Sequence, residues 1–270
     1  MTPRTCFPLT IGALLVAGCV TTGPGGQKSF VVISTDQEVS MGKEMDAELK
    51  TQEKLLADSA WQKYLAGIGR RIVAVSDRRD LEYEFNVIES DQINAFAAPG
   101  GFVYFYTGIL SEIDNEAQVA AVMAHEISHV VARHGIKKLQ TVLGLSVLLQ
   151  IALGDAGQLT QQAVGVVLGL AINGYGRSME LEADRYGVDY MARAGYNPRG
   201  AVEMFQKLAD LSGGGQQGVF EKISSTHPET AERVAKINEQ IGAMPPSTNS
   251  LPLYPERYLQ MRTRLPKKAG

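Results

Sequence analysis

The sequence predicts an α+β fold that is mostly helical, with a small β-sheet beside one buried helix. Helix-forming stretches with apolar residues at helical spacing make up most of the chain between residues 35 and 242. Only residues 82–90 and 94–110 are typical of strands, and the second stretch is rich in aromatic and β-branched residues. Residues 115–135 are apolar on nearly every side, which is typical of a buried helix.

The composition favours one substantial hydrophobic core. The chain has 270 residues, 44% of them hydrophobic, which is enough for one domain with a small appendage. The formal net charge is -3 without long runs of one sign, and this argues against nucleic acid as a partner because such binding needs a basic face. The sequence has no repeat of about 20–50 residues, which argues against a solenoid or propeller.

Residues 1–18 have the features of a lipoprotein signal peptide. One early Arg4 precedes an apolar run over residues 7–16, which is far shorter than the roughly 20 residues that span a bilayer. The sequence VAGC that ends at Cys19 resembles a bacterial lipobox, in which cleavage precedes a cysteine that becomes lipidated. We therefore expect residues 19–34 to be a lipidated, flexible tether to the periplasmic face of the outer membrane. Ordinary signal cleavage nearby is the alternative.

Cysteine usage restricts the metal ligands that the chain can offer. The only other cysteine is Cys6, inside the predicted signal peptide. The mature chain would then have no disulfide, so any metal must be held by histidine and carboxylate side chains.

Caps and apolar spacing predict the helices in order. Thr35 and Glu38 form a capping-box pattern at the start of the first helix. The buried helix begins near Asp114 or Asn115, both good N-caps, and ends at Gly135. The other helices are predicted over residues 59–75, 176–196, 199–212 and 227–241, with a proline-rich tail over 243–270.

Residues 139–172 form an apolar, glycine-dotted insertion that we interpret as a helical hairpin. Neither half has the roughly 18 uninterrupted apolar residues of a membrane span, and Asp155 lies between the halves. The favoured interpretation is a subdomain that covers the core, and contact with a membrane is the alternative.

The buried helix carries a His-Glu-x-x-His motif at His125, Glu126 and His129. A spacing of four places both imidazoles on one face of the helix, within reach of one metal ion. Glu126 is rotated aside, where it can act on a water molecule as a general base. A chance occurrence on an apolar helix is the alternative, but it would leave buried polar groups that need partners.

Catalytic zinc sites commonly have three protein ligands, so a third is expected elsewhere. The helix over residues 177–187 offers Glu180, Glu182 and Asp184. Glu180 and Asp184 share a face, which suits Glu180 as the ligand and Asp184 as the acceptor for an imidazole N–H. A solvated acidic face is the alternative.

Three stretches taken together resemble metallopeptidase family forty-eight: HEISHVVARH, GRSMELEAD and STHPETAER, in that order. The resemblance extends upstream through QEVSMGKEMDAEL and NAFAAPGGFVYFYTGIL, and it is greatest to the soluble periplasmic lipoproteins of the family. It implies a gluzincin-type zinc metallopeptidase domain over residues 35–242. It also implies one zinc ion per chain on His125, His129 and Glu180, with the register fixed by Asp184.

The resemblance implies roles for three further residues. His134 is expected to be structural or to support a ligand, and an imidazole at a helix terminus is the alternative. His227 is expected near the metal, where it either steadies the oxyanion or fills the fourth zinc position and keeps the enzyme latent; a surface cap is the alternative. Arg177 is expected to pair with Glu180 or another acidic group, or to bind a substrate carbonyl.

The implied activity is hydrolysis of peptide bonds in misfolded or unassembled envelope proteins, with Glu126 as the base. We expect extended substrate to pair with a sheet edge at Gly101, Phe102, Val103 and Tyr104. A non-proteolytic or latent zinc-binding assembly factor is the alternative. A prenyl-peptide protease is disfavoured, and the sequence gives no oligomeric state.

Overall fold

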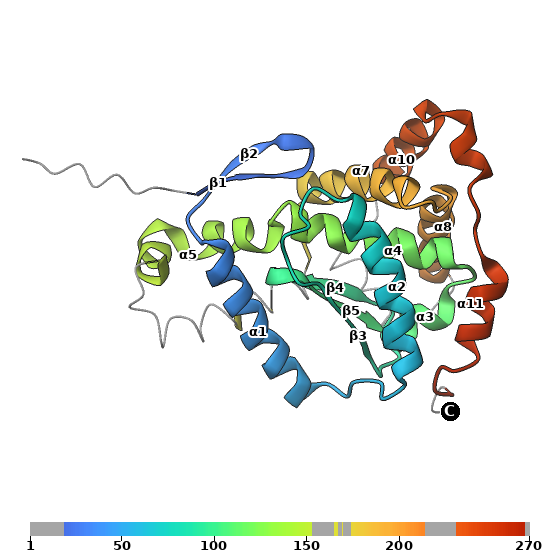
Figure 1. Ribbon diagram of the computed structural model, residues 1–270, viewed down its shortest axis with the longest axis horizontal. Helices are drawn as coiled ribbons and strands as arrows, with labels where there is room; N and C mark the ends of the chain where they lie inside the picture. The colour runs from blue at the N-terminus through green and yellow to red at the C-terminus, as the bar shows by residue number, and fades with distance from the viewer. Residues whose placement is uncertain (1–18, 153–164, 167–168, 170–173, 214–230, 268–270) are drawn as a thin grey trace, which may run out of the picture.

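The computed structural model describes residues 19–152, 165–166, 169, 174–213 and 231–267, and it confirms a mostly helical α+β fold (Figure 1). Its helices are α1 (Thr35–Gln52), α2 (Ser59–Val75), α3 (Thr107–Glu112), α4 (Glu116–Val131), α5 (His134–Ala152), α7 (Arg177–Arg193), α8 (Arg199–Gly213), α10 (Ala231–Ala243) and α11 (Pro255–Arg262). Its strands are β1 (Cys19–Thr22), β2 (Lys28–Val31), β3 (Glu84–Ile88), β4 (Ala95–Ala98) and β5 (Phe102–Tyr106). Three short 3-10 helices are η1 (Pro24–Gly26), η2 (Pro99–Gly101) and η3 (Pro246–Ser250).

The buried helix α4 is the centre of the molecule (Figure 1). Asn115 caps it, since its side chain accepts a hydrogen bond from the backbone N–H of Gln118. The helix packs most extensively on α7 and also contacts α2, α8 and β4. It ends at Val131, short of the predicted Gly135, because Arg133 adopts a left-handed conformation with φ of 55°. A new helix, α5, then begins at His134.

The small sheet has the strand order β3–β5–β4, with β5 parallel to β3 and antiparallel to β4. The turn between β4 and β5 contains Gly100 and Gly101, whose φ values of 81° and 100° favour glycine. All five residues of β5 are buried, which is compatible with its uninterrupted run of aromatic and β-branched residues.

The central position of β5 corrects the expectation that substrate pairs with Gly101, Phe102, Val103 and Tyr104. Both sides of β5 are already hydrogen-bonded, to β3 and to β4. A peptide therefore cannot add to it, because strand addition needs unpaired backbone groups. Among the described strands, β3 and β4 form the two edges of this sheet.

The segment predicted as a flexible tether differs from that expectation, because it includes an antiparallel hairpin. β1 pairs with β2, and Cys19 lies opposite Val31. Helix α1 follows with a capping box formed by Ser34 and Gln37, one residue earlier than predicted. The signal-peptide prediction falls on residues 1–18, outside the described residues.

The C-terminal tail packs on the domain. The Tyr258 side chain in α11 is buried, and its hydroxyl donates a hydrogen bond to the backbone carbonyl of Leu110. Two backbone carbonyls upstream of α11, those of Asn249 and Leu251, accept hydrogen bonds from the amide of Asn197.

The apolar insertion is described only in part. Helix α5 covers its start, with a break at Gly144, where φ is 75°. Most of the predicted hairpin after Ala152 falls outside the described residues. Within the described part of the chain, no helix combines the length and apolar character of a membrane span.

A buried ion cluster joins the start of α1 to the end of α4. Glu38 is 1% exposed and accepts hydrogen bonds from both terminal nitrogens of Arg78, at 2.9 and 2.7 Å. Arg133 approaches the same carboxylate at 2.8 Å. Burial by itself would lower the pKa of Arg78, but the hydrogen bonds to Glu38 raise it. One carboxylate thus stabilises two buried guanidinium groups.

Glu38→Ala is expected to lower the free energy of unfolding by about 3–5 kcal/mol, because it leaves two buried cations without their carboxylate. Urea unfolding followed by circular dichroism measures this loss. The control is Lys54→Ala, which removes a pair with Glu89 whose lysine side chain is 74% exposed. We expect it to cost about 0.2–1 kcal/mol, and equal losses in the two variants would contradict the prediction.

Candidate metal centre

Three metal-binding side chains converge between α4 and α7. One turn of α4 separates His125 from His129, and their Nε2 atoms lie 3.0 Å apart. The carboxylate of Glu180 comes from α7, and its oxygens lie 3.4 Å from Nε2 of His125 and 3.6 Å from Nε2 of His129. The side chains of His129 and Glu180 are each 1% exposed.

The donor spacing fits a tetrahedral zinc ion. Zinc lies about 2.0–2.1 Å from nitrogen and oxygen ligands, so tetrahedral donors are roughly 3.3–3.4 Å apart. The two Nε2 atoms are 3.0 Å apart, and they lie 3.4 and 3.6 Å from different oxygens of Glu180, on either side of that value. Two imidazoles and one carboxylate are also a common donor set of catalytic zinc sites. The donors therefore match a zinc site both in their separations and in their chemical type.

A glycine lets α7 come close enough to α4 to deliver Glu180. A Cβ atom at Gly187 would lie 3.1 Å from the backbone nitrogen of His125 and 3.2 Å from its Cα, tighter than ordinary contact. Gly187 is seven residues after Glu180, so both lie on the same face of α7. The absent side chain at Gly187 thus permits the close approach of α7 to His125.

The outer nitrogen of His125 is held by Asp184. Its Nδ1 atom lies 2.9 Å from the Asp184 carboxylate, the usual partner of a metal-binding imidazole. Burial alone would lower the pKa of His125, but hydrogen bonds with Asp184 and Glu180 raise it to about 10. Without a metal, the surroundings of this imidazole therefore stabilise a positive charge.

Arg233 from α10 holds the two carboxylates of α7. It donates hydrogen bonds to both oxygens of Asp184, at 2.6 and 2.7 Å, and its Nη1 lies 3.1 Å from Glu180. Burial alone would raise the pKa of Asp184, but the hydrogen bonds from Arg233 and His125 lower it. Asp184 is thus kept ionised, as an acceptor for the imidazole N–H.

A second chain of contacts supports His129. Its Nδ1 lies 2.8 Å from Nδ1 of His134, and Nε2 of His134 lies 3.1 Å from the Glu182 carboxylate. Burial lowers the pKa of His134 despite its contact with Glu182. A neutral His134 that donates through Nε2 to Glu182 accepts at Nδ1 from His129. His129 then carries its proton on Nδ1, so Nε2 can bind a metal. The Tyr175 ring stacks on His129, with centroids 4.1 Å apart.

Comparison with known proteins places this geometry in a family. The sequence profile of peptidase family M48 matches residues 59–241, more than half of the chain. The chain belongs to peptidase family M48. By family it is a metallopeptidase, and the zinc-peptidase fold and resemblance predicted from its motifs are confirmed.

Several known proteases are similar to this M48 chain. Mitochondrial metalloendopeptidase OMA1 of Schizosaccharomyces pombe is 31% identical over 86% of the chain and 72% of its own length. Metalloprotease LoiP of Escherichia coli is 30% identical over 87% of the chain and 98% of its own length. The beta-barrel assembly-enhancing protease of Escherichia coli is 31% identical over 82% of the chain, which spans only 47% of that relative. All three relatives are named as proteases, and two of them as metalloproteases or metalloendopeptidases.

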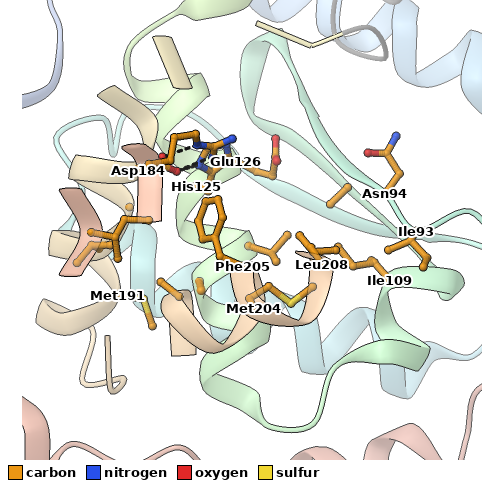
Figure 2. Close-up of a pocket in the computed structure, with 18 residues that line it drawn as sticks. Ile93, Asn94, Ile109, His125, Glu126, Asp184, Met191, Met204, Phe205 and Leu208 are labelled. Carbon is orange, nitrogen blue, oxygen red and sulfur yellow. Dashed lines mark hydrogen bonds and ion pairs between the residues drawn. The ribbon is translucent and has the colours of Figure 1, made fainter. Parts of the chain in front are cut away.

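Glu126 of the M48 chain lies beside the three donors. It is 2% exposed, and together with His125 it lines a cavity between α4, α7 and α8. Figure 2 shows both residues at one side of this cavity, whose other labelled residues are mostly apolar. The motif glutamate therefore adjoins both the donor cluster and an apolar space.

The other residues singled out in the sequence are placed as follows. Arg177 is 71% exposed at its side chain and pairs with Glu232 of α10. His134 contacts His129, as described above. Cys19 begins β1. His227 lies outside the described residues.

Four residues around the site were not assigned roles from the sequence. Arg233 lies within the STHPETAER motif, but its contact with Asp184 has a sequence separation of 49, so no local pattern indicates it. Glu182 does not share the helix face of Glu180 and Asp184, and its carboxylate contacts His134 instead. Tyr175 and Gly187 lie next to the metal-binding stretch, and a glycine inside a helical pattern was the available signal of close packing.

Proposed function

We propose that this chain is a zinc-dependent metalloendopeptidase in which His125, His129 and Glu180 bind one zinc ion. The observation that carries the proposal is the convergence of these three donors beside the buried Glu126. When bound, zinc acidifies water and polarises a carbonyl group.

Glu126 is the general base and acid in this proposal. Its carboxylate takes a proton from the attacking water and later delivers that proton to the nitrogen of the leaving amine. Asp184 and His134 each fix one imidazole through its outer nitrogen, so the inner nitrogens face the metal position. These contacts keep the site in one geometry before substrate arrives.

His227 is proposed as the group that completes the site, either by steadying the oxyanion or by filling the fourth metal position. Helix α10 begins at Ala231, and its Arg233 contacts both Asp184 and Glu180. His227 is only four positions before Ala231 in the sequence, and this short connection to a helix that contacts the site supports the proposal.

We propose that extended substrate pairs with β4, the described edge nearer the metal-binding helix. Strand β4 contacts α4, and its first residue, Ala95, lines the same cavity as Glu126. Backbone hydrogen bonds depend little on the side chains of the substrate, which suits substrates that are misfolded or unassembled.

The proposed substrates are envelope proteins, and the proposed location is the periplasmic face of the outer membrane, with Cys19 lipidated. The lipobox-like sequence before Cys19 supports the anchor, and the name of the beta-barrel assembly-enhancing proteases supports the substrate class. A latent or non-proteolytic assembly factor, with His227 closing the zinc site, is the second candidate.

The test compares cleavage of casein and of an unfolded outer-membrane barrel before and after treatment with a chelator. The proposal expects cleavage that the chelator stops and added zinc restores. His227→Ala is assayed in parallel, because it would open a closed site. If neither protein shows chelator-sensitive cleavage, the assembly factor is favoured.

Asp184→Asn is expected to weaken zinc binding by about 10–100-fold, because it replaces the charged acceptor behind His125. Competition with a chromophoric chelator measures the affinity. The matched control is Asp189→Asn on the same helix, whose side chain is 45% exposed and pairs with Arg193. Equal zinc affinities for the two variants would refute a supporting role for Asp184.

A further inference from the structure

We infer that the cavity beside Glu126 selects an aliphatic side chain on the residue that follows the scissile bond. This inference rests on the proposed peptidase function and adds a substrate preference to it. The cavity, called here the apolar pocket, has a volume of about 80 Å³. Its apolar lining includes Ile109, Ala121, Val188, Ala201, Met204 and Leu208.

The walls of the apolar pocket come from several elements and are mostly hydrocarbon. Helix α4 contributes Ala121 and α7 contributes Val188. Helix α8 contributes Met204 and Leu208, which are labelled in Figure 2. Such a lining favours apolar side chains, because a polar group would lose its water without gaining a partner.

The charged groups on the pocket lining are paired or belong to the metal centre. Asp184 and Arg233 are bonded to each other, and the Arg233 guanidinium also lies 4.7 Å from the ring centre of Phe205. Because this pair is close to neutral as a unit, it gives a charged substrate side chain little to bind. A lysine or aspartate in the pocket is therefore disfavoured.

The position of Glu126 decides which substrate residue enters. In the proposed mechanism Glu126 delivers a proton to the leaving nitrogen, so it must lie within hydrogen-bond reach of that atom. Glu126 also lines the apolar pocket. The side chain nearest to the pocket thus belongs to the residue that contributes the leaving nitrogen.

The pocket volume sets the size of that side chain. An apolar cavity of about 150 Å³ accepts benzene, and the apolar pocket has about 80 Å³. Leucine, isoleucine and methionine match this space, whereas tryptophan exceeds it. The small residues Ala121 and Ala201 are 9% and 5% exposed, and larger side chains there would fill the pocket.

Asn94 supplies a polar anchor beside this apolar lining. It is 4% exposed and lines the pocket just before β4. Its amide Nδ2 is buried and has no hydrogen-bond partner among the described residues. A buried donor left in this state costs stability, and a substrate backbone carbonyl would satisfy it. The same cavity therefore offers an apolar space for a substrate side chain and the Asn94 amide for a substrate backbone carbonyl.

The test measures kcat/KM for quenched peptides that differ only at the residue after the scissile bond, with mass spectrometry locating each cut. Leucine and methionine peptides are expected to be cleaved about 10–100-fold faster than glycine, aspartate or tryptophan peptides. Met204→Ala enlarges the pocket and is expected to raise the relative rate for phenylalanine and tryptophan about tenfold. Ala201→Leu fills it and is expected to abolish the leucine preference while glycine peptides are still cleaved.

Gln206→Ala, an exposed change on the same helix, is the control and should leave the preference unchanged. Circular dichroism checks that the variants fold; if Ala201→Leu does not, Met204→Ala carries the test. Cleavage without a preference after the scissile bond, or an unchanged preference in Met204→Ala, overturns the inference and leaves the peptidase proposal standing.

Binding separates the inference from the proposed function. Fluorescence anisotropy with the Glu126→Gln protein measures peptide affinity without turnover. The leucine peptide is expected to bind about tenfold more tightly than the aspartate peptide, and Ala201→Leu in the same background should remove this difference. If the wild type cleaves nothing, the peptidase proposal fails; equal affinities for the two peptides defeat the pocket assignment on their own.

Discussion

Glu126→Gln is expected to lower the rate of peptide hydrolysis by about 10²–10⁴-fold while the zinc content stays unchanged. Glutamine keeps the shape of the side chain but cannot accept the proton of the attacking water. The three proposed donors are His125, His129 and Glu180, so metal binding is not expected to require the carboxylate of Glu126. Turnover of a quenched peptide and metal analysis of the same preparation give the two quantities.

Glu239→Gln is the control for this change, because Glu239 is exposed on α10. It should retain both activity and zinc. Wild-type turnover by the Glu126→Gln protein would reject Glu126 as the base. Loss of zinc in that protein would instead show that Glu126 supports the metal.

Glu180→Gln is expected to remove most of the bound zinc, with an affinity loss larger than the roughly 10–100-fold that follows from changing a supporting residue. Glu180 is the carboxylate closest to both imidazole Nε2 atoms, at 3.4 and 3.6 Å. A neutral amide is a poor replacement for a charged oxygen ligand. Zinc per chain after dialysis against a weak chelator measures the effect.

Glu182→Gln is the matched variant on the same helix. Glu182 contacts His134 at 3.1 Å, so its loss should weaken zinc binding by only about 10–100-fold. The two variants together test the register assigned to α7. Greater zinc loss in Glu182→Gln than in Glu180→Gln would show that the ligand had been misassigned.

The helical part of the metal centre was predictable because it depends on local geometry. The i, i+4 spacing of His125 and His129 places them on one face of any helix. The same spacing joins Glu180 to Asp184, and the structure has both of these carboxylates at His125. The α+β class was predictable for a similar reason, since the length and apolar spacing of each helix or strand depend on the residues of that element alone.

Other features depended on contacts between distant segments. The FVYFY stretch was recognisable as a strand, but its central place in the sheet depends on pairing with β3 and β4. The kink at Arg133 turns His134 toward His129, and nothing in the sequence of the predicted continuous helix indicated that turn. The contact of Arg233 with Asp184 likewise spans 49 positions.

The sequence by itself predicted the donor residues and the motif glutamate. The helical repeat pairs His125 with His129 and Glu180 with Asp184, and the family resemblance selected Glu180 as the third donor. Only the tertiary structure decided how the donors are supported and where the apolar pocket lies. Those features require α7, α8 and α10 to pack on α4, and packing depends on side-chain shape across segments far apart in the chain. Gly187 shows the difference: the sequence displays a glycine in a helix, and the structure shows that its missing side chain admits the backbone of His125.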